Sequence, residues 1–135
     1  MGYTLHASSL RTVTDGDTTR WCSPLHVAAP DGSIADQYGL MCTALFDDIQ
    51  SAAGSGAKVL EAVRRIEAGE VEQIDADGNG WVAHIERDRV WFESLYSQGV
   101  GGEVSFAQYK LAVQTYVQFL ADPEHQPVEV PFPGS

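Results

Sequence analysis

The chain has 135 residues, 44% of them hydrophobic, and its 19 acidic and 8 basic side chains give a formal net charge of −11. This length and apolar content predict one folded domain, residues 1–135, and exclude a disordered chain. So acidic a composition argues against nucleic acid and anionic membranes as partners, because phosphate binding requires Lys and Arg. No apolar run approaches the roughly 20 residues of a membrane span.

The N-terminal segment MGYTLHASSLRTV has neither a basic start nor an apolar block, so we expect no secretory signal and a cytoplasmic protein. Cys22 and Cys42 lie far apart in the chain. In a cytoplasmic protein, two reduced and buried thiols are expected in preference to a disulfide.

Strands are predicted near the N-terminus. Residues 3–13 contain β-branched side chains in partial alternation, and the turn residues 14–17 end this strand. A second strand is predicted over residues 21–29, where Pro24 indicates a sheet edge or a bulge.

Two helices are predicted next, because apolar residues then recur at intervals of three and four. The first helix carries the stripe Tyr38, Met41, Cys42, Leu45 and Ile49. Gly54-Ser55-Gly56 is expected to end it. A second helix is predicted over residues 57–68, with Gly69 as its C-cap. The short connection predicts an antiparallel helical hairpin.

The C-terminal part is predicted to be a glycine loop, a helix and an extended tail. Gly99, Gly101 and Gly102 indicate the loop. Ser105 and Gln108 form a capping box that opens the last helix, which Asp122-Pro123 ends. Its apolar face consists of Phe106, Tyr109, Val113, Tyr116, Val117 and Leu120. The proline-rich tail is expected to lie extended against the domain.

Residues 75–86, DADGNGWVAHIE, match the EF-hand calcium-loop pattern at every specified position. The calcium ligands would be Asp75, Asp77, Asn79, the Trp81 carbonyl and Glu86. An EF-hand also requires a helix on each side of the loop. Only about half of the apolar positions of such helices are apolar here, and Gly69 would interrupt the incoming helix.

The same residues are favoured as a β-hairpin, because Trp81, Ala83 and Ile85 alternate with the more polar residues between them. Asp77-Gly78 or Asn79-Gly80 could supply the positive φ angles of a type I′ turn. Residues 90–96 are rich in β-branched and aromatic side chains, which favour a further strand. We therefore predict a three-stranded antiparallel meander, with calcium binding by an EF-hand-like or an irregular loop as the alternative.

No catalytic constellation is visible in the sequence. The four histidines, His6, His26, His84 and His125, stand singly and without metal-ligand spacing. No G-x-S-x-G nucleophile elbow occurs, and no Walker loop follows the glycines near residue 100. We therefore predict that the chain is not an enzyme and has no cofactor, unless the calcium alternative holds.

Acidic residues gather in two parts of the chain and predict a binding surface for a basic protein partner. The alternative is a solvated face that serves solubility. The predicted partner-binding residues are Asp47, Asp48, Glu67, Glu70, Glu72, Asp75 and Asp77.

These elements together predict an α+β fold: N-terminal strands, a helical hairpin, a three-stranded meander and a C-terminal helix packed on the sheet. Residues 71–121 resemble small acidic immunity proteins of bacterial polymorphic-toxin systems, including those of contact-dependent growth inhibition. The matching segments are the D-G-N-aromatic hairpin at Asp77 to Trp81, with Gly80 as an extra residue, and the helix motifs at Ser105 to Tyr109 and Tyr116 to Leu120. The resemblance implies a cytoplasmic immunity protein that blocks a cognate toxin domain, often a nuclease, by occluding its active site.

Overall fold

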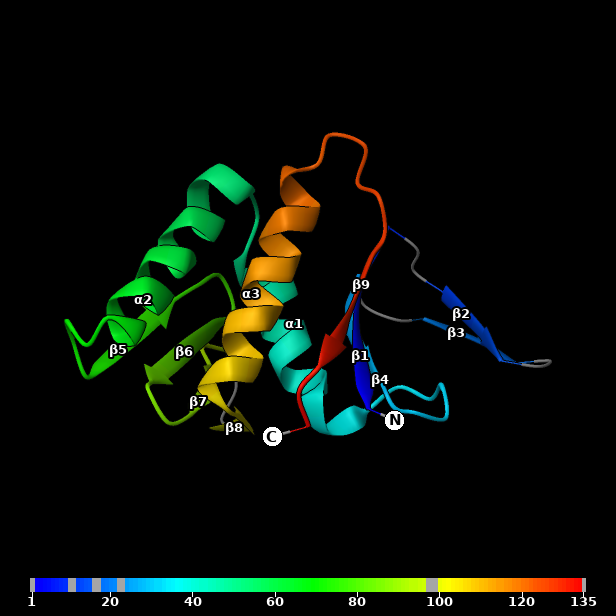
Figure 1. The fold of residues 1–135 in the computed structure, drawn as a ribbon, viewed down its shortest axis with the longest axis horizontal. Coiled ribbons are helices and arrows are strands. Elements are labelled where there is room, and N and C mark those ends of the chain that lie inside the picture. Colours follow the sequence, from blue (N-terminus) through cyan, green and yellow to red (C-terminus); the bar gives the residue numbers. More distant parts are fainter. Residues whose placement is uncertain (1, 10–11, 16–17, 22–23, 97–99, 135) are drawn as a thin grey trace.

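The part of the chain that the structure describes has an α+β fold of two antiparallel sheets, three α-helices and one separate hairpin (Figure 1). The computed structural model describes residues 2–9, 12–15, 18–21, 24–96 and 100–134. The strands are β1 (Tyr3–Ala7), β2 (Thr12–Asp15), β3 (Thr18–Trp21), β4 (Leu25–Ala28), β5 (Gln73–Asp77), β6 (Trp81–Glu86), β7 (Val90–Ser94), β8 (Val100–Val104) and β9 (Val128–Phe132). The α-helices are α1 (Gly39–Asp48), α2 (Ala57–Glu67) and α3 (Phe106–Ala121).

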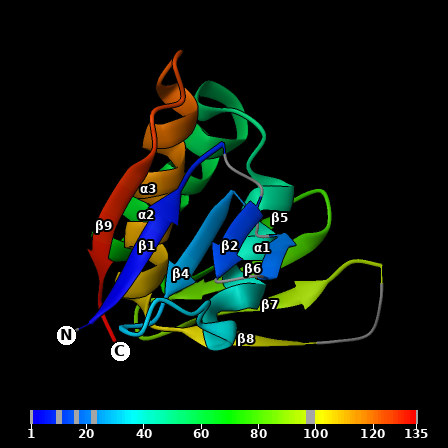
Figure 2. The same cartoon turned by 90° about the vertical axis from the view of Figure 1, so that its right-hand side faces the viewer.

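The first sheet has the strand order β4-β1-β9, and all its pairs are antiparallel. Strand β1 alternates as the sequence predicted, since Leu5 and Ala7 are fully buried while His6 is not. The tail, which was expected to lie extended, pairs with β1 as strand β9, beside it in Figure 2.

The two predicted N-terminal strands are four shorter strands in the structure. The strand predicted over residues 3–13 is divided between β1 and β2, and the one predicted over 21–29 between β3 and β4. Strands β2 and β3 form their own hairpin, which projects from the rest of the molecule in Figure 1. Pro24 precedes β4 at an edge of the first sheet, as its residue type indicated.

The second sheet runs in chain order, β5-β6-β7-β8. The predicted meander of β5, β6 and β7 is confirmed, but the predicted glycine loop is wrong because Gly101 and Gly102 belong to a fourth strand, β8. Gly99 lies outside the described residues. The pairing of β7 with β8 shifts register, and Gly102 has φ +67°, with room for Leu40 where a side chain would otherwise stand.

The turn between β5 and β6 is not of type I′. That turn requires positive φ at both central residues, yet the described glycines with positive φ are Gly32, Gly69 and Gly102. The turn is instead shaped by close approach to helix α1, because a Cβ on Gly78 would lie 2.0 Å from the Asp48 Cγ atom. A contact distant in sequence therefore replaces the local preference.

The predicted apolar stripe of the first helix is confirmed, since Met41, Cys42, Leu45 and Ile49 are buried. The prediction that Gly54-Ser55-Gly56 ends this helix is wrong: α1 ends at Asp48. Residues 52–56 form a π-helical turn that leads directly into α2, and Ser51 caps it by accepting a hydrogen bond from the Gly54 N–H. Ser51 is thus the N-cap residue of this segment.

Helix α2 ends as predicted, with Gly69 at φ +77° immediately beyond its C-cap residue Ala68. The two helices are consecutive and joined by a short connection. Helix α1 packs mainly on β4 and β8, however, whereas α2 packs mainly on α3 and β5. Both helices therefore pack on the second sheet, and α1 also packs on β4 of the first sheet.

Helix α3 begins with the predicted capping box, in which the Gln108 N–H donates to Ser105 Oγ (3.1 Å) and the Ser105 N–H donates to Gln108 Oε1 (2.8 Å). It packs on β1 and β9 of the first sheet, while its Tyr109 ring meets Phe92 of β7 at 5.9 Å. The helix thus stands between the two sheets (Figure 1). No helix in the described ranges is long and apolar enough to span a membrane.

Candidate functional site

The last turn of α1 holds the β5–β6 turn by two neighbouring carboxylates. The Gly80 N–H donates to Asp48 Oδ1 (2.9 Å), and the Trp81 indole N–H donates to Asp47 Oδ2 (3.0 Å). Burial raises the pKa of Asp48 above its ordinary value, although hydrogen bonds from backbone N–H groups of the turn oppose this shift. Helix α1 and the second sheet are therefore joined through this turn.

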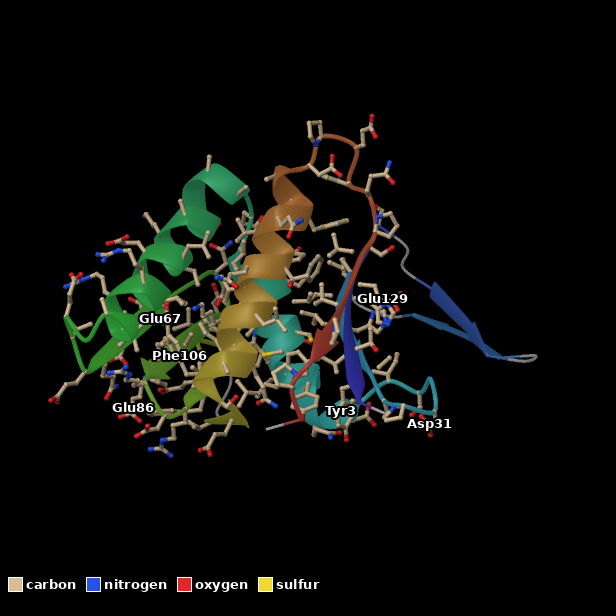
Figure 3. The ribbon with its side chains drawn as sticks, viewed as in Figure 1. Tyr3, Asp31, Glu67, Glu86, Phe106 and Glu129 are labelled. Carbon is tan, nitrogen blue, oxygen red and sulfur yellow. The ribbon has the colours of Figure 1, made fainter. Side chains whose placement is uncertain are left out.

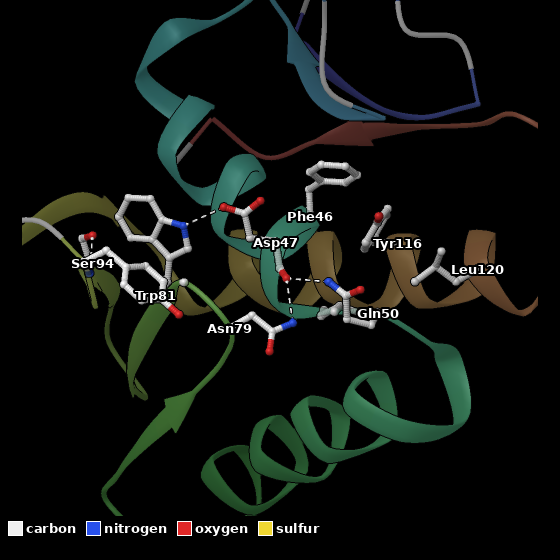
Figure 4. Close-up of a pocket in the computed structure, with 11 residues that line it drawn as sticks. Phe46, Asp47, Gln50, Asn79, Trp81, Ser94, Tyr116 and Leu120 are labelled. Atoms are coloured by element: carbon white, nitrogen blue, oxygen red, sulfur yellow. Dashed lines mark hydrogen bonds between the residues drawn. The ribbon is translucent and has the colours of Figure 1, made fainter.

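An open groove of about 620 Å³ lies beside this junction (Figure 4). Helix α1 contributes Phe46 and Asp47, strand β6 contributes Trp81, and helix α3 contributes Tyr116 and Leu120. The amide of Gln50 donates to the Asp47 backbone carbonyl at 2.7 Å and orders the rim of the groove. Aromatic rings thus converge from both sides of a single acidic side chain.

Some large hydrophobic side chains are exposed to water, and two of them lie at this groove. Those that are exposed in the described part of the chain are Phe46 (37%), Leu95 (47%), Tyr96 (83%) and Val100 (66%). Phe46 and Tyr96 line the groove, Leu95 precedes Tyr96, and Val100 pairs with Glu93 on the adjoining strand. The two that line the groove, Phe46 and Tyr96, indicate an interaction surface there.

The predicted acidic patch is divided into two groups by the fold. Asp47, Asp48 and Asp77 gather at the β5–β6 turn, where Asp48 and Asp77 also line a cavity of about 90 Å³. Glu67 is the last residue of α2, labelled in Figure 3, and Glu70 and Glu72 follow the helix. Since β5 separates the groups by about 13 Å of strand, they do not form one continuous cluster.

Several of these carboxylates are already neutralised by neighbouring basic side chains. Glu67 pairs with Lys110, and Glu70 pairs with Arg64 at 2.8 Å. Hydrogen bonds from the Arg64 guanidinium lower the pKa of Glu70. Within the described ranges, ion pairs are absent from the rest of the set apart from Asp75: Asp47, Asp48, Glu72 and Asp77.

Asp75 belongs to a polar cluster on the outer face of the second sheet. Its Oδ1 atom lies 2.8 Å from His84 Nδ1, while Glu93 Oε1 lies 3.0 Å from His84 Nε2. Burial alone would lower the pKa of His84, but the hydrogen bonds to both carboxylates outweigh it and raise the pKa. The imidazole also stacks on Trp91 at 5.1 Å, and the Arg89 guanidinium lies 4.3 Å from the Trp91 ring centroid.

The candidate calcium loop is a β-hairpin in the structure, because β5 and β6 stand where an EF-hand would have two helices. Asp75 contacts His84, and Glu86 accepts a hydrogen bond from Arg89 at 3.1 Å. No group of three His, Cys, Asp or Glu side chains suited to a metal ion occurs among the residues that the structure describes. Calcium binding by Asp75, Asp77, Asn79, Trp81 and Glu86 stays a prediction.

The other three histidines, His6, His26 and His125, lie outside this cluster. His6 and His26 face each other on β1 and β4, with their rings stacked at 4.8 Å. His125 follows α3 with φ +49°. Cys42 is a free, buried thiol, and burial raises its pKa to about 12, which keeps it protonated and unreactive. Cys22 lies outside the described residues.

A scan against protein-family models found no match, and searches of curated proteins and of solved structures found no significant match. The resemblance to immunity proteins therefore stays a prediction, and the site has to be judged by its own chemistry.

The groove is the feature that sequence reasoning missed. Its aromatic side chains come from elements that are far apart in the chain, so no local pattern connects them. One signal was present: Phe46 falls outside the apolar stripe predicted for its helix, at one edge of the buried face. An aromatic residue in that position would have marked the rim.

Proposed function

We propose that this protein is a protein-binding inhibitor of the immunity type, which neutralises a cognate bacterial toxin domain in the cytoplasm by covering its active site. The observation that carries the proposal is the aromatic groove with its rim of exposed apolar side chains. Protein interfaces are enriched in aromatic residues at their centres, and a few buried aromatic anchors supply most of the binding energy.

The charge of the chain supports a basic partner. With a net charge of −11, the protein repels anionic surfaces and attracts a basic toxin domain over long range. Such attraction raises the association rate more than the affinity. A nuclease is a suitable target, because an active site built to hold phosphate is basic and could be occupied by the carboxylates at the β5–β6 turn, Asp47 and Asp77.

The proposal is tested by co-expression. The reading frame directly upstream of the gene is expressed in a bacterial host with and without this chain, and growth is recorded. We expect arrest without the chain, growth with it, and a complex of the two proteins on gel filtration. The proposal is refuted if the chain neither binds nor protects against a partner that arrests growth, or if the upstream product is harmless.

The electrostatic part of the proposal has a separate readout. Association rates between the purified proteins are measured at increasing salt concentration. We expect the rate to fall steeply as salt screens the attraction, while the dissociation rate changes little. An association rate that does not depend on salt would reject the electrostatic contribution and leave the aromatic groove as the proposed interface.

A further inference from the structure

We propose that the groove beside α1 binds an arginine side chain of the partner protein, with the guanidinium stacked between aromatic rings and paired with Asp47. This inference rests on the proposed function, because it names the partner chemistry that the same surface would recognise. It depends on the charge, the hydrogen bonding and the shape of the groove, which are independent of which toxin domain is bound.

Asp47 is the one charged residue among the described residues that line the groove. Its Oδ2 atom accepts the Trp81 indole N–H at 3.0 Å, which holds the carboxylate and the indole ring together. In Figure 4 the carboxylate lies between Trp81 and Phe46. Its Oδ1 atom has no hydrogen-bond partner among the residues that the structure describes, so one acceptor faces an incoming donor.

Unlike Glu67 and Glu70, Asp47 is not paired with a neighbouring basic side chain in the described part of the chain. Glu70 is paired with Arg64 and Glu67 with Lys110, whereas Asp47 is without an ion pair in the described part of the molecule. Asp47 is half-buried, and a charge that water screens less interacts more strongly with a cation than a fully exposed one does. The groove therefore presents a carboxylate that a cation from another molecule could pair with.

An arginine side chain suits this groove better than a lysine side chain does. Its planar guanidinium stacks on aromatic faces and presents a fork of N–H donors to a carboxylate, whereas the lysine ammonium is a compact and strongly hydrated charge. The protein already contains this arrangement elsewhere, since Arg89 lies over the Trp91 ring at 4.3 Å and donates to Glu86 and Glu103. The walls offered to the partner are Phe46, Trp81 and Tyr96.

Tyr96 indicates that the groove is completed by another molecule. Its side chain is 83% exposed, although it stands at the rim of a cavity lined by other rings. The volume of about 620 Å³ exceeds that of one side chain, so residues flanking the arginine can enter with it. Covering Tyr96 and Phe46 in this way would bury the apolar surface that the isolated chain leaves in water.

The inference is tested with a probe that carries one arginine side chain. N-acetyl-arginine methylamide is titrated into ¹⁵N-labelled protein, and the indole N–H resonance of Trp81 is followed after assignment with the Trp81→Phe variant. The probes for comparison are the citrulline analogue, which is neutral and nearly isosteric, and the lysine analogue. We expect a saturable shift with arginine and roughly fivefold to tenfold weaker binding of citrulline, because the neutral side chain loses the ion pair and the cation–π contact.

Two matched variants locate the effect. Asp47→Asn keeps an oxygen to accept the Trp81 indole N–H but removes the charge, and Asp88→Asn removes one charge from the exposed turn at the other end of β6. We expect Asp47→Asn to bind arginine and citrulline equally, while Asp88→Asn keeps the preference of the native chain. Circular dichroism and the indole resonances verify that both variants are folded.

The inference is overturned by equal binding of arginine and citrulline to the native protein, by no response to arginine up to its solubility limit, by tighter binding of lysine, or by a preference that survives in Asp47→Asn. Its failure can be distinguished from failure of the proposed function. Protection from the toxin with no arginine preference would reject only the groove assignment. Arginine binding in a chain that neither binds nor protects against the upstream product would reject only the immunity function.

Discussion

The junction between α1 and the β5–β6 turn provides the most specific prediction about stability. Asp48 accepts a hydrogen bond from the Gly80 N–H at 2.9 Å, 32 residues away in the chain, and is partly buried. Asp48→Ala removes this acceptor and leaves the N–H groups of the turn without it. Asp48→Asn keeps an oxygen in the same place and removes only the charge. The pair of variants therefore separates the hydrogen bond from the charge.

The expected magnitudes follow from this geometry. A hydrogen bond to a charged group contributes about 1.5–3 kcal/mol, so Asp48→Ala should lower the free energy of unfolding by about 2 kcal/mol. Burial raises the pKa of Asp48 despite these hydrogen bonds, which means that the charge itself is unfavourable there. We therefore expect Asp48→Asn to change the free energy of unfolding by less than about 0.5 kcal/mol.

Urea unfolding followed by tryptophan fluorescence measures these differences, with Asp88→Ala as a control in an exposed turn. A pH series adds a second check. Because the folded-state pKa of Asp48 lies above its ordinary 3.8, the folded protein holds this proton more tightly than the unfolded chain does. Relative to Asp48→Asn, the native protein should therefore lose stability as pH rises from 3.8 through the raised pKa. Equal losses in the two variants, or none in Asp48→Ala, would refute the reasoning.

Four further predictions concern other parts of the fold. Gly102→Ala should lower the melting temperature, because residue 102 has φ +67° and the new Cβ would lie 2.7 Å from Leu40 Cδ2; an unchanged melting temperature would show that β8 relaxes freely. Ser105→Ala should cost about 1 kcal/mol in urea unfolding through loss of the α3 cap, and Ser105→Asp should restore most of it. Protonated His84 should stabilise the fold below its ordinary pKa of 6.5, with the gain lost as pH rises through the raised folded pKa; a pH-independent difference in melting temperature from His84→Gln would contradict this. Calorimetry at millimolar calcium should give no heat, because residues 75–86 form a hairpin; a saturable heat would restore the calcium alternative.

The calcium-loop pattern and the hairpin share the same twelve residues, so local sequence alone could support either. The pairing of β5 with β6 and of β6 with β7 decides between the two backbone conformations, since each strand supplies the hydrogen-bond partners of the next. Side chains that a calcium loop would use are engaged by other groups, Asp75 by His84 and Glu86 by Arg89. For this segment, the alternation of apolar and polar residues therefore predicts the backbone conformation better than the complete motif match does.

Sequence alone determined the features that depend on near neighbours in the chain: the capping box of α3, the buried stripe of α1, the glycine that ends α2 and the alternation of β6. Each is decided by residues within a turn of helix or along one strand, where periodicity and capping chemistry act directly. The net charge likewise favours a basic partner, which stays a prediction.

Only the tertiary structure decided how those elements meet. Gly101 and Gly102 join a strand because β7 offers backbone partners, and the β5–β6 turn departs from its local preference because Asp48 lies against it. The groove depends on Trp81 meeting Asp47, 34 residues earlier in the chain. Which carboxylates stay unpaired was equally invisible in the sequence. Pairing depends on distance in space, and the partners of Glu67 and Asp75, Lys110 and His84, are supplied by other elements of the fold.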